Sequence, residues 1–245
     1  MHTTRMRTNL SHPTLDIFQR TQTDTGTAGT ASSRSYDDLR RRIVEMDLPP
    51  DATLSRAELA AEYGISQTPI REALQRLEQD GLVRIFPQSR TIVTRISIPQ
   101  LLESHFLRVA VESEIVRVLS LSNADIAPKL NAIIAMQETL VGNTSEVGMF
   151  NELDEAFHQT MFQAAGQPGL FALIRAKGGH LARARRLDLP KEGKMRSIVE
   201  RHQEITAAIA AGEPLRAQEA LRDHLTGTVS RIDILRQEHP QHFQS

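Results

Sequence analysis

The chain of 245 residues contains no cysteine and no tryptophan, and aromatic residues make up only 4% of it. The absence of cysteine excludes disulfides, zinc ribbons, iron–sulfur clusters and thiol nucleophiles, and it is compatible with a reducing cytoplasm. So few aromatic residues disfavour a β-sandwich. Ala, Leu, Arg and Glu are abundant instead, which is typical of packed helices.

Long apolar runs are also missing. No stretch approaches the roughly 18 apolar residues that a membrane-spanning helix needs, and the N-terminus lacks the apolar segment of a secretory signal. We therefore expect a cytoplasmic protein with no membrane partner. The formal net charge is only −1 at pH 7, so nucleic-acid binding cannot be argued from a basic composition and depends on motif and placement.

Changes in composition and in the pattern of apolar residues divide the chain into three predicted parts: residues 1–34, 35–98 and 99–241. The first part is rich in Thr and Ser, with Gly26 and Gly29 between them and no sustained period. Such a composition is typical of a disordered tail. The other two parts carry regular patterns and predict one small domain and one larger domain.

Residues 35–98 show the pattern of three short helices followed by two strands. We expect helices from Ser35 to just before Pro49, from Ser55 to Gly64 and from Ser66 to Asp80, and strands at 82–86 and 91–95 joined by a turn over 87–90. Three helices and a two-stranded ribbon in this order predict a winged helix-turn-helix.

Residues 99–241 carry only helical signals, separated by Gly, Pro and Asn. The expected helices are 99–121, 124–141, 145–165, 169–187, 194–211 and 214–237, the fourth with a possible kink at Gly178 and Gly179. The predicted fold class is therefore mostly α, a winged helix-turn-helix followed by an all-helical bundle.

The string LAAEYGISQTPIREALQRLEQDGLV, residues 59–83, resembles the DNA-binding signature of GntR-type bacterial transcription regulators. The helical remainder resembles the FCD effector-binding domain of the FadR subfamily, and the resemblance spans about residues 35–235. It implies a ligand-responsive repressor, a homodimer that binds a pseudo-palindromic DNA operator and is released by a small organic acid.

Seven residues of the first domain are candidates for DNA contact. Gln67, Thr68 and Arg71 lie at the start of the predicted recognition helix, whose first turns meet base edges in the major groove. Arg can bind guanine O6 and N7, and Gln can pair with adenine. Arg40, Arg41 and Arg42 could reach phosphates from the first helix, and Arg90 could do so from the wing.

The alternative for each of these arginines is a solvated side chain. The family usually has Arg where this chain has Gln67, and Gly at the wing tip where it has Arg90. The operator sequence of this protein therefore cannot be inferred from the operators of relatives.

Asp154, His158, His202 and His224 lie beside the apolar stripes of three predicted helices. Imidazole and carboxylate together suit Zn, Ni, Mn or Fe. From spacing alone, hydrogen-bonded core histidines are the more common outcome. The resemblance favours a metal, because many FCD domains hold one with an Asp, a His four residues later and two further His.

Arg108 precedes Glu112 by four residues in the first helix of the bundle, and His105 lies one turn earlier. In FCD regulators an Arg at this place commonly meets the carboxylate of the effector, and His105 could line the same pocket. The alternative is an Arg108–Glu112 surface ion pair, which contributes less than about 1 kcal/mol.

Two other functions remain as alternatives to the regulator. A metal-dependent enzyme could use the Asp and His residues, but the sequence has no H-E-x-x-H motif and no obvious general base beside them. An architectural DNA-binding protein without an effector would favour aliphatic residues where the bundle has His and Arg.

Overall fold

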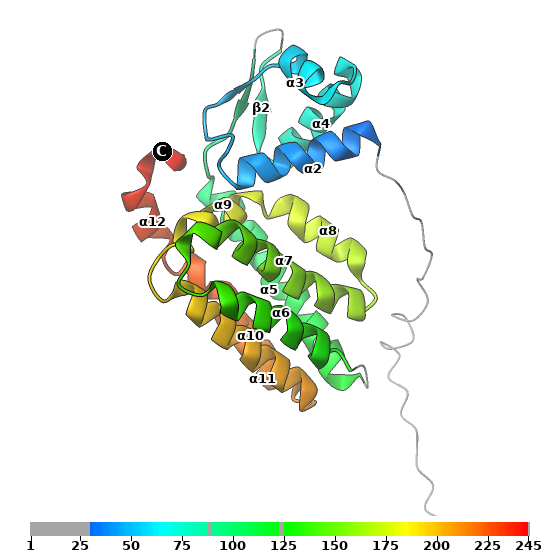
Figure 1. Cartoon of the computed structure of the whole chain (residues 1–245), viewed down its shortest axis with the longest axis vertical. Coiled ribbons are helices and arrows are strands. Elements are labelled where there is room, and N and C mark those ends of the chain that lie inside the picture. Colours follow the sequence, from blue (N-terminus) through cyan, green and yellow to red (C-terminus); the bar gives the residue numbers. More distant parts are fainter. Residues whose placement is uncertain (1–29, 88–89, 123–124, 245) are drawn as a thin grey trace, which may run out of the picture.

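The computed structural model describes residues 30–87, 90–122 and 125–244, which form two units packed on one another (Figure 1). The first unit comprises α2 (Ala31–Val44), β1 (Thr53–Leu54), α3 (Arg56–Tyr63), α4 (Gln67–Gln79), β2 (Val83–Ile85) and β3 (Thr91–Val93). The second comprises α5 (Ile98–Leu121), α6 (Ala127–Leu140), η1 (Thr144–Glu146), α7 (Val147–Ala164), α8 (Pro168–Lys177), α9 (Gly179–Asp188), α10 (Lys194–Ala210), α11 (Pro214–Val229), α12 (Ile232–Glu238) and η2 (Pro240–His242).

The helix-turn-helix forms as expected. The Ser55 hydroxyl accepts a hydrogen bond from the Glu58 N–H at 3.3 Å and so caps α3. Gly64 ends that helix with φ of 65°, a left-handed conformation that glycine adopts without strain. Ile70, Leu74 and the rest of the inner face of α4 are buried against α2 and α3.

Two details of this unit differ from the prediction. The first helix begins at Ala31 rather than after Ser35, because the Thr30 hydroxyl accepts from the Ser33 N–H at 3.2 Å and caps it there. The sheet has three antiparallel strands in the order β1-β3-β2, since Thr53 pairs with Ile92. The predicted disordered tail otherwise lies outside the described residues, as do Gln88 and Ser89 of the predicted turn.

The second unit is helical throughout the described residues, but two of the six expected helices are each divided in two. The fourth becomes α8 and α9, which meet at Gly178. The sixth becomes α11 and α12, which are separated at Ser230 and Arg231. None of the described helices is both long enough and apolar enough to cross a bilayer.

The C-terminal residues extend the second unit past its expected end at 241. Phe243 is 2% exposed and pairs with Ile96 in a parallel bridge, with the Ile96 N–H donating to the His242 carbonyl at 2.7 Å. Gln244 N–H donates back to the Ile96 carbonyl at 2.9 Å. The segment between the two units is therefore held by the end of the chain.

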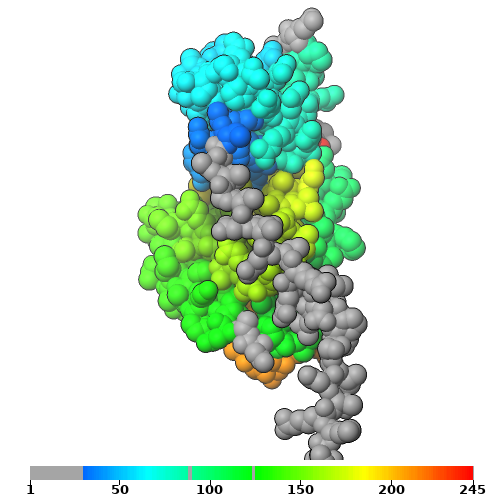
Figure 2. Space-filling view, turned by 90° about the vertical axis from the view of Figure 1, so that its right-hand side faces the viewer, coloured from blue at the N-terminus to red at the C-terminus, as the bar shows by residue number. Residues whose placement is uncertain are grey.

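The two units meet across α2, α8 and α9. Figure 2 shows the blue surface of α2 directly above the yellow to yellow-green surface of α8, and α2 also packs on α9. Lys177 donates to the Gln79 carbonyl at 3.0 Å, and Arg183 donates to the Thr94 carbonyl at 2.5 Å. The side chain of Leu82 fills the space beside Gly179.

We expect Gly179→Val to destabilise the protein more than Gly169→Val. A Cβ on Gly179 would lie 2.5 Å from Leu82 Cδ2, whereas a Cβ on Gly169 would meet nothing within 4 Å. Both glycines lie in the first turn of a helix, so the change in helix propensity is similar. The difference in unfolding free energy between the variants should be about 1–3 kcal/mol, measured by urea denaturation; equal values would contradict this packing.

Candidate functional site

Four side chains converge in the interior of the bundle. Asp154 and His158 come from α7, His202 from α10 and His224 from α11, and one ligand atom from each lies within 4.8 Å of all the others. His158 Nε2 and His224 Nε2 are 3.0 Å apart, and His202 Nε2 is 3.6 Å from Asp154 Oδ1. The structure thus brings together all four of the predicted metal ligands.

The donor set fits a divalent transition metal. The buried atoms Asp154 Oδ1 and His202 Nε2 have no hydrogen-bond partner among the described residues. Buried polar atoms without partners cost free energy, and two imidazole nitrogens at 3.0 Å can share only one proton between them. A cation bound by one carboxylate and three imidazoles would satisfy all four groups.

A second layer of polar groups orients these ligands. Glu112 Oε2 lies 2.6 Å from His158 Nδ1, and Gln137 Oε1 lies 2.8 Å from His202 Nδ1. Each contact turns the Nε2 atom of the ring toward the centre of the cluster, the usual arrangement around metal-binding histidines. The sequence spacing predicts Glu112 only as a partner of Arg108. Gln137 was not predicted, although it is an amide on the otherwise apolar inner face of α6.

Burial and neighbouring charges set the ionisation of this cluster. Burial lowers the pKa of His202 to about 3 despite the nearby Asp154 carboxylate, and burial together with the neighbouring imidazoles lowers the pKa of His224. Burial acts to raise the pKa of Glu112, but the charges of Arg108 and His158 bring it down to about 2. His202 and His224 are therefore neutral at pH 7, as metal binding requires.

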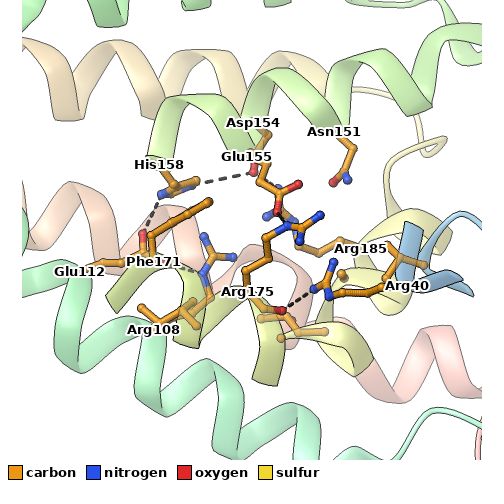
Figure 3. Close-up of a pocket in the computed structure, with 15 residues that line it drawn as sticks. Arg40, Arg108, Glu112, Asn151, Asp154, Glu155, His158, Phe171, Arg175 and Arg185 are labelled. Carbon is orange, nitrogen blue, oxygen red and sulfur yellow. Dashed lines mark hydrogen bonds and ion pairs between the residues drawn. The ribbon is translucent and has the colours of Figure 1, made fainter. Parts of the chain in front are cut away.

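The cluster borders a cavity of about 80 Å³ (Figure 3). Its charged lining includes four arginines, Arg40, Arg108, Arg175 and Arg185. At about 10–15 Å³ for each water-sized position, this volume suits a small organic molecule. A further cavity of about 230 Å³ lies on the His224 side.

Arg108 lines both cavities, and its Nε donates to Glu112 Oε1 at 2.6 Å. The pair is not the surface pair that was considered, since the Arg108 side chain is 12% exposed and that of Glu112 is 1% exposed. Arg185 also lines both cavities and lies 2.7 Å from Asp154 Oδ2. The described residues that line the two cavities do not include His105.

A separate groove of about 530 Å³ lies between α4 and the wing. Gln67 and Arg71 line it from α4, and Arg90 lines it from the residue just before β3. Thr68 is exposed in the first turn of α4. The residues predicted at the recognition helix and at the wing therefore share one open surface.

The arginines of α2 separate into different environments. Arg41 is exposed and pairs with Asp38 at 2.6 Å and Glu45 at 2.8 Å. Arg40 was expected to reach phosphate together with Arg41, but it is 5% exposed and faces the second unit instead. Its neighbours Leu39 and Ile43 are core residues, and this phase of the helix turns Arg40 inward.

We expect the metal-free protein to lose stability as the pH falls from about 7 to about 5. His202 has a folded pKa of about 3 and an unfolded pKa of about 6.5, so the unfolded chain binds the extra proton. His202 alone accounts for about 2 kcal/mol of this loss. Urea denaturation in chelator should show it, and His202→Asn should flatten the dependence by that amount; an unchanged slope would contradict the assignment.

Comparison with known proteins gives consistent matches to two family models. The model of the FCD domain matches residues 103–227, and the model described as bacterial regulatory proteins, gntR family, matches residues 31–93. An uncharacterised HTH-type transcriptional regulator of Streptomyces ambofaciens is 35% identical, over 85% of this chain and 87% of that protein. The HTH-type transcriptional repressor RspR of Escherichia coli K12 is 26% identical, over 85% of this chain and 91% of that protein.

The fold also matches solved structures. The E. coli protein McbR/YncC superposes with a TM-score of 0.70 at 21% sequence identity, over 86% of this chain and 99% of that one. At 21% sequence identity, this match is evidence for the fold alone.

Proposed function

The chain belongs to the gntR family of bacterial regulatory proteins and carries an FCD domain, and from this premise we propose that it is a repressor released from DNA by a small organic acid. The observation that carries the proposal is the placement of the four-residue cluster. Asp154 and His158 lie beside a cavity that is also lined from α2, within the DNA-binding unit. A ligand in this cavity contacts both units at once.

DNA binding is assigned to the groove between α4 and the wing. Gln67, Thr68 and Arg71 face solvent at the start of the recognition helix, where side chains can reach base edges. Arg90 extends the same surface from the wing, and Arg41 supplies a phosphate contact from α2. The operator is a pseudo-palindrome bound by a homodimer. An exposed apolar pair on α5, Leu102 at 44% and Phe106 at 76%, supports an interface between two copies.

The cofactor is a divalent transition metal, Zn, Ni, Mn or Fe, held by Asp154, His158, His202 and His224. When bound, it supplies a Lewis-acidic centre that takes a carboxylate or hydroxyl oxygen of the effector. Arg108 lines the cavity beside it and offers further donors to a carboxylate. Arg185, which pairs with Asp154, keeps that carboxylate ionised and in place.

A metal-dependent enzyme is the other function that this cluster could serve. Such an enzyme needs a general base with a pKa near the working pH. Glu112 is the carboxylate that contacts His158, but Arg108 and His158 lower the pKa of Glu112 to about 2, against the effect of burial. A carboxylate so weakly basic supports positioning rather than proton transfer, and the chain is proposed to have no catalytic role.

The function is tested by operator release. An operator selected from random duplexes should bind the metal-loaded protein, and one member of a panel of hydroxy, sugar and aromatic acids should weaken that binding. Fluorescence anisotropy of labelled operator measures both. Loss of the acid response on chelation would support the metal-linked site, whereas an operator affinity that no acid alters would contradict the proposal.

Replacing Arg71 and Arg41 should have different effects on DNA binding. Arg71→Ala is expected to weaken operator binding by about 1–3 kcal/mol and to relax sequence preference, because it removes a base contact. Arg41→Ala should weaken binding to operator and to random DNA alike, with a smaller dependence on salt. The measurement is anisotropy at several salt concentrations, and an unchanged operator affinity for Arg71→Ala would remove its assigned role.

Metal content should follow the four ligands. Protein purified without an affinity tag is expected to hold about one equivalent of a divalent transition metal, measured by elemental analysis. His202→Ala should lose most of it, while His105→Ala is the matched control because His105 lines neither cavity. Equal metal content in wild type and His202→Ala would mean that the four residues do not bind the metal and have a structural role instead.

A further inference from the structure

Arg40 is unusual among the residues of the DNA-binding unit because its charge is buried against the other unit. It is 5% exposed and lines the cavity beside the four-residue cluster. Its Nη2 donates to the main-chain carbonyl of Arg175, and its Nε has no hydrogen-bond partner among the described residues. Figure 3 shows Arg40 entering the pocket from α2, on the side away from His158 and Glu112.

The other three arginines of the cavity all have carboxylate partners. Arg108 lies 2.6 Å from Glu112. Arg175 lies 2.7 Å from Glu155 and 3.3 Å from Asp37. Arg185 lies 2.7 Å from Asp154. Within each pair the positive and negative charges neutralise each other, so the three pairs add little net charge to the cavity.

Arg40 has no such partner. In the part of the chain that the structure describes, no carboxylate forms a direct ion pair with it. Burial and the like-charged Arg175 lower the pKa of Arg40, and the more distant carboxylates of Glu155 and Asp80 offset this only in part. A buried guanidinium without a counter-ion is costly. The cavity therefore presents one cation that no carboxylate contacts directly, with an unused N–H donor, opposite the Asp154 and His158 end.

We infer that Arg40 binds a second anionic group of the effector, which makes the effector an acid with two anionic groups, a dicarboxylate or a phosphorylated acid. The inference rests on the proposed function, in which one end of the acid occupies the four-residue cluster. The second carboxylate or phosphate then accepts from the unused donor of Arg40 and supplies a counter-ion in direct contact with it. A monocarboxylic acid with the same carbon skeleton has no second anionic group and leaves Arg40 without an ion-pair partner.

This contact also gives the acid a direct connection to the DNA-binding unit. Arg40 belongs to α2, and α2 packs along α4, the recognition helix. On the same pair of helices, Tyr36 donates to the Asp80 carboxylate at 2.6 Å, joining α2 to the end of α4. An acid that draws Arg40 toward the cluster favours one orientation of α2 and α4 relative to the bundle, and by linkage it changes operator affinity by the factor by which DNA changes acid affinity.

The test uses two matched pairs of acids with zinc-loaded, full-length protein. Lactate and malate share a 2-hydroxy acid end, and malate adds a carboxylate; glycerate and 3-phosphoglycerate share such an end, and the latter adds a phosphate. Isothermal titration should show wild type binding malate or 3-phosphoglycerate at least about tenfold more tightly than its partner, the gain typical of a charge-assisted hydrogen bond. Whichever pair shows the gain identifies the second anionic group.

Arg40→Gln should reduce that selectivity to within about threefold while leaving lactate or glycerate affinity unchanged, and Arg40→Lys should restore part of it. Arg41→Gln is the matched control, since Arg41 is the adjacent arginine of α2 and is exposed, and it should keep the wild-type selectivity. The unchanged affinity for the monoacid also shows that the rest of the variant's site is intact.

Two results would overturn the inference without affecting the proposed function. One is wild-type protein that binds the members of each pair equally, or binds none of the four acids, while another monocarboxylic acid releases the operator. The other is selectivity that persists in Arg40→Gln. If no acid of any kind binds or releases the operator, the proposed function fails as well. The wild-type comparison needs no variant, so equal binding of the paired acids overturns the inference even if Arg40→Gln does not fold, and Arg40→Lys then provides the second test of Arg40.

Discussion

The carboxylate of Asp154 is the point on which the interior of the bundle depends. It is 1% exposed and lies between Arg185, at 2.7 Å, and the ring of His202, at 3.6 Å. Burial favours its protonated form, but the charge of Arg185 and the three surrounding imidazoles hold its pKa well below the usual range. Because Asp154 stays ionised, its buried charge requires partners from α7, α9, α10 and α11, and this requirement brings those helices to one place.

Arg185 extends this constraint to the junction of the units, because it belongs to α9. The side chains of α9 point to two sides of the helix. Arg185 faces Asp154, whereas Arg183 donates to the Thr94 carbonyl and His180 accepts from the Ser97 N–H at 3.0 Å. Thr94 and Ser97 lie between β3 and α5. The same ten-residue helix therefore contacts the candidate metal site and the segment that joins the units, so a shift of α9 at one of these contacts alters the other.

Much of this arrangement could be read from the sequence, where the signals are local. Gly64, Gly178 and the periodic apolar residues mark helix ends and inner faces, and the family motif identifies the helix-turn-helix. The features that were missed depend on contacts between distant segments. The short strand at Thr53 exists because Ile92 pairs with it, and the C-terminal residues are ordered because Phe243 packs under the segment at Ile96. Neither contact leaves a periodic signal in the sequence.

Arg40 illustrates the same limit at the level of function. In the sequence it is the first of three consecutive arginines, a pattern that indicates a basic surface. The phase of α2 buries Arg40 and leaves Arg41 exposed, because Leu39 and Ile43 fix which side of the helix faces inward. Replacing a buried charge by an apolar residue of similar volume is often neutral or stabilising, and the hydrogen bond to the Arg175 carbonyl uses only Nη2 of the guanidinium. An anionic ligand in the cavity gives the unused Nε donor a partner and a counter-ion in direct contact, and the DNA-binding unit then responds to the ligand through a residue of its own.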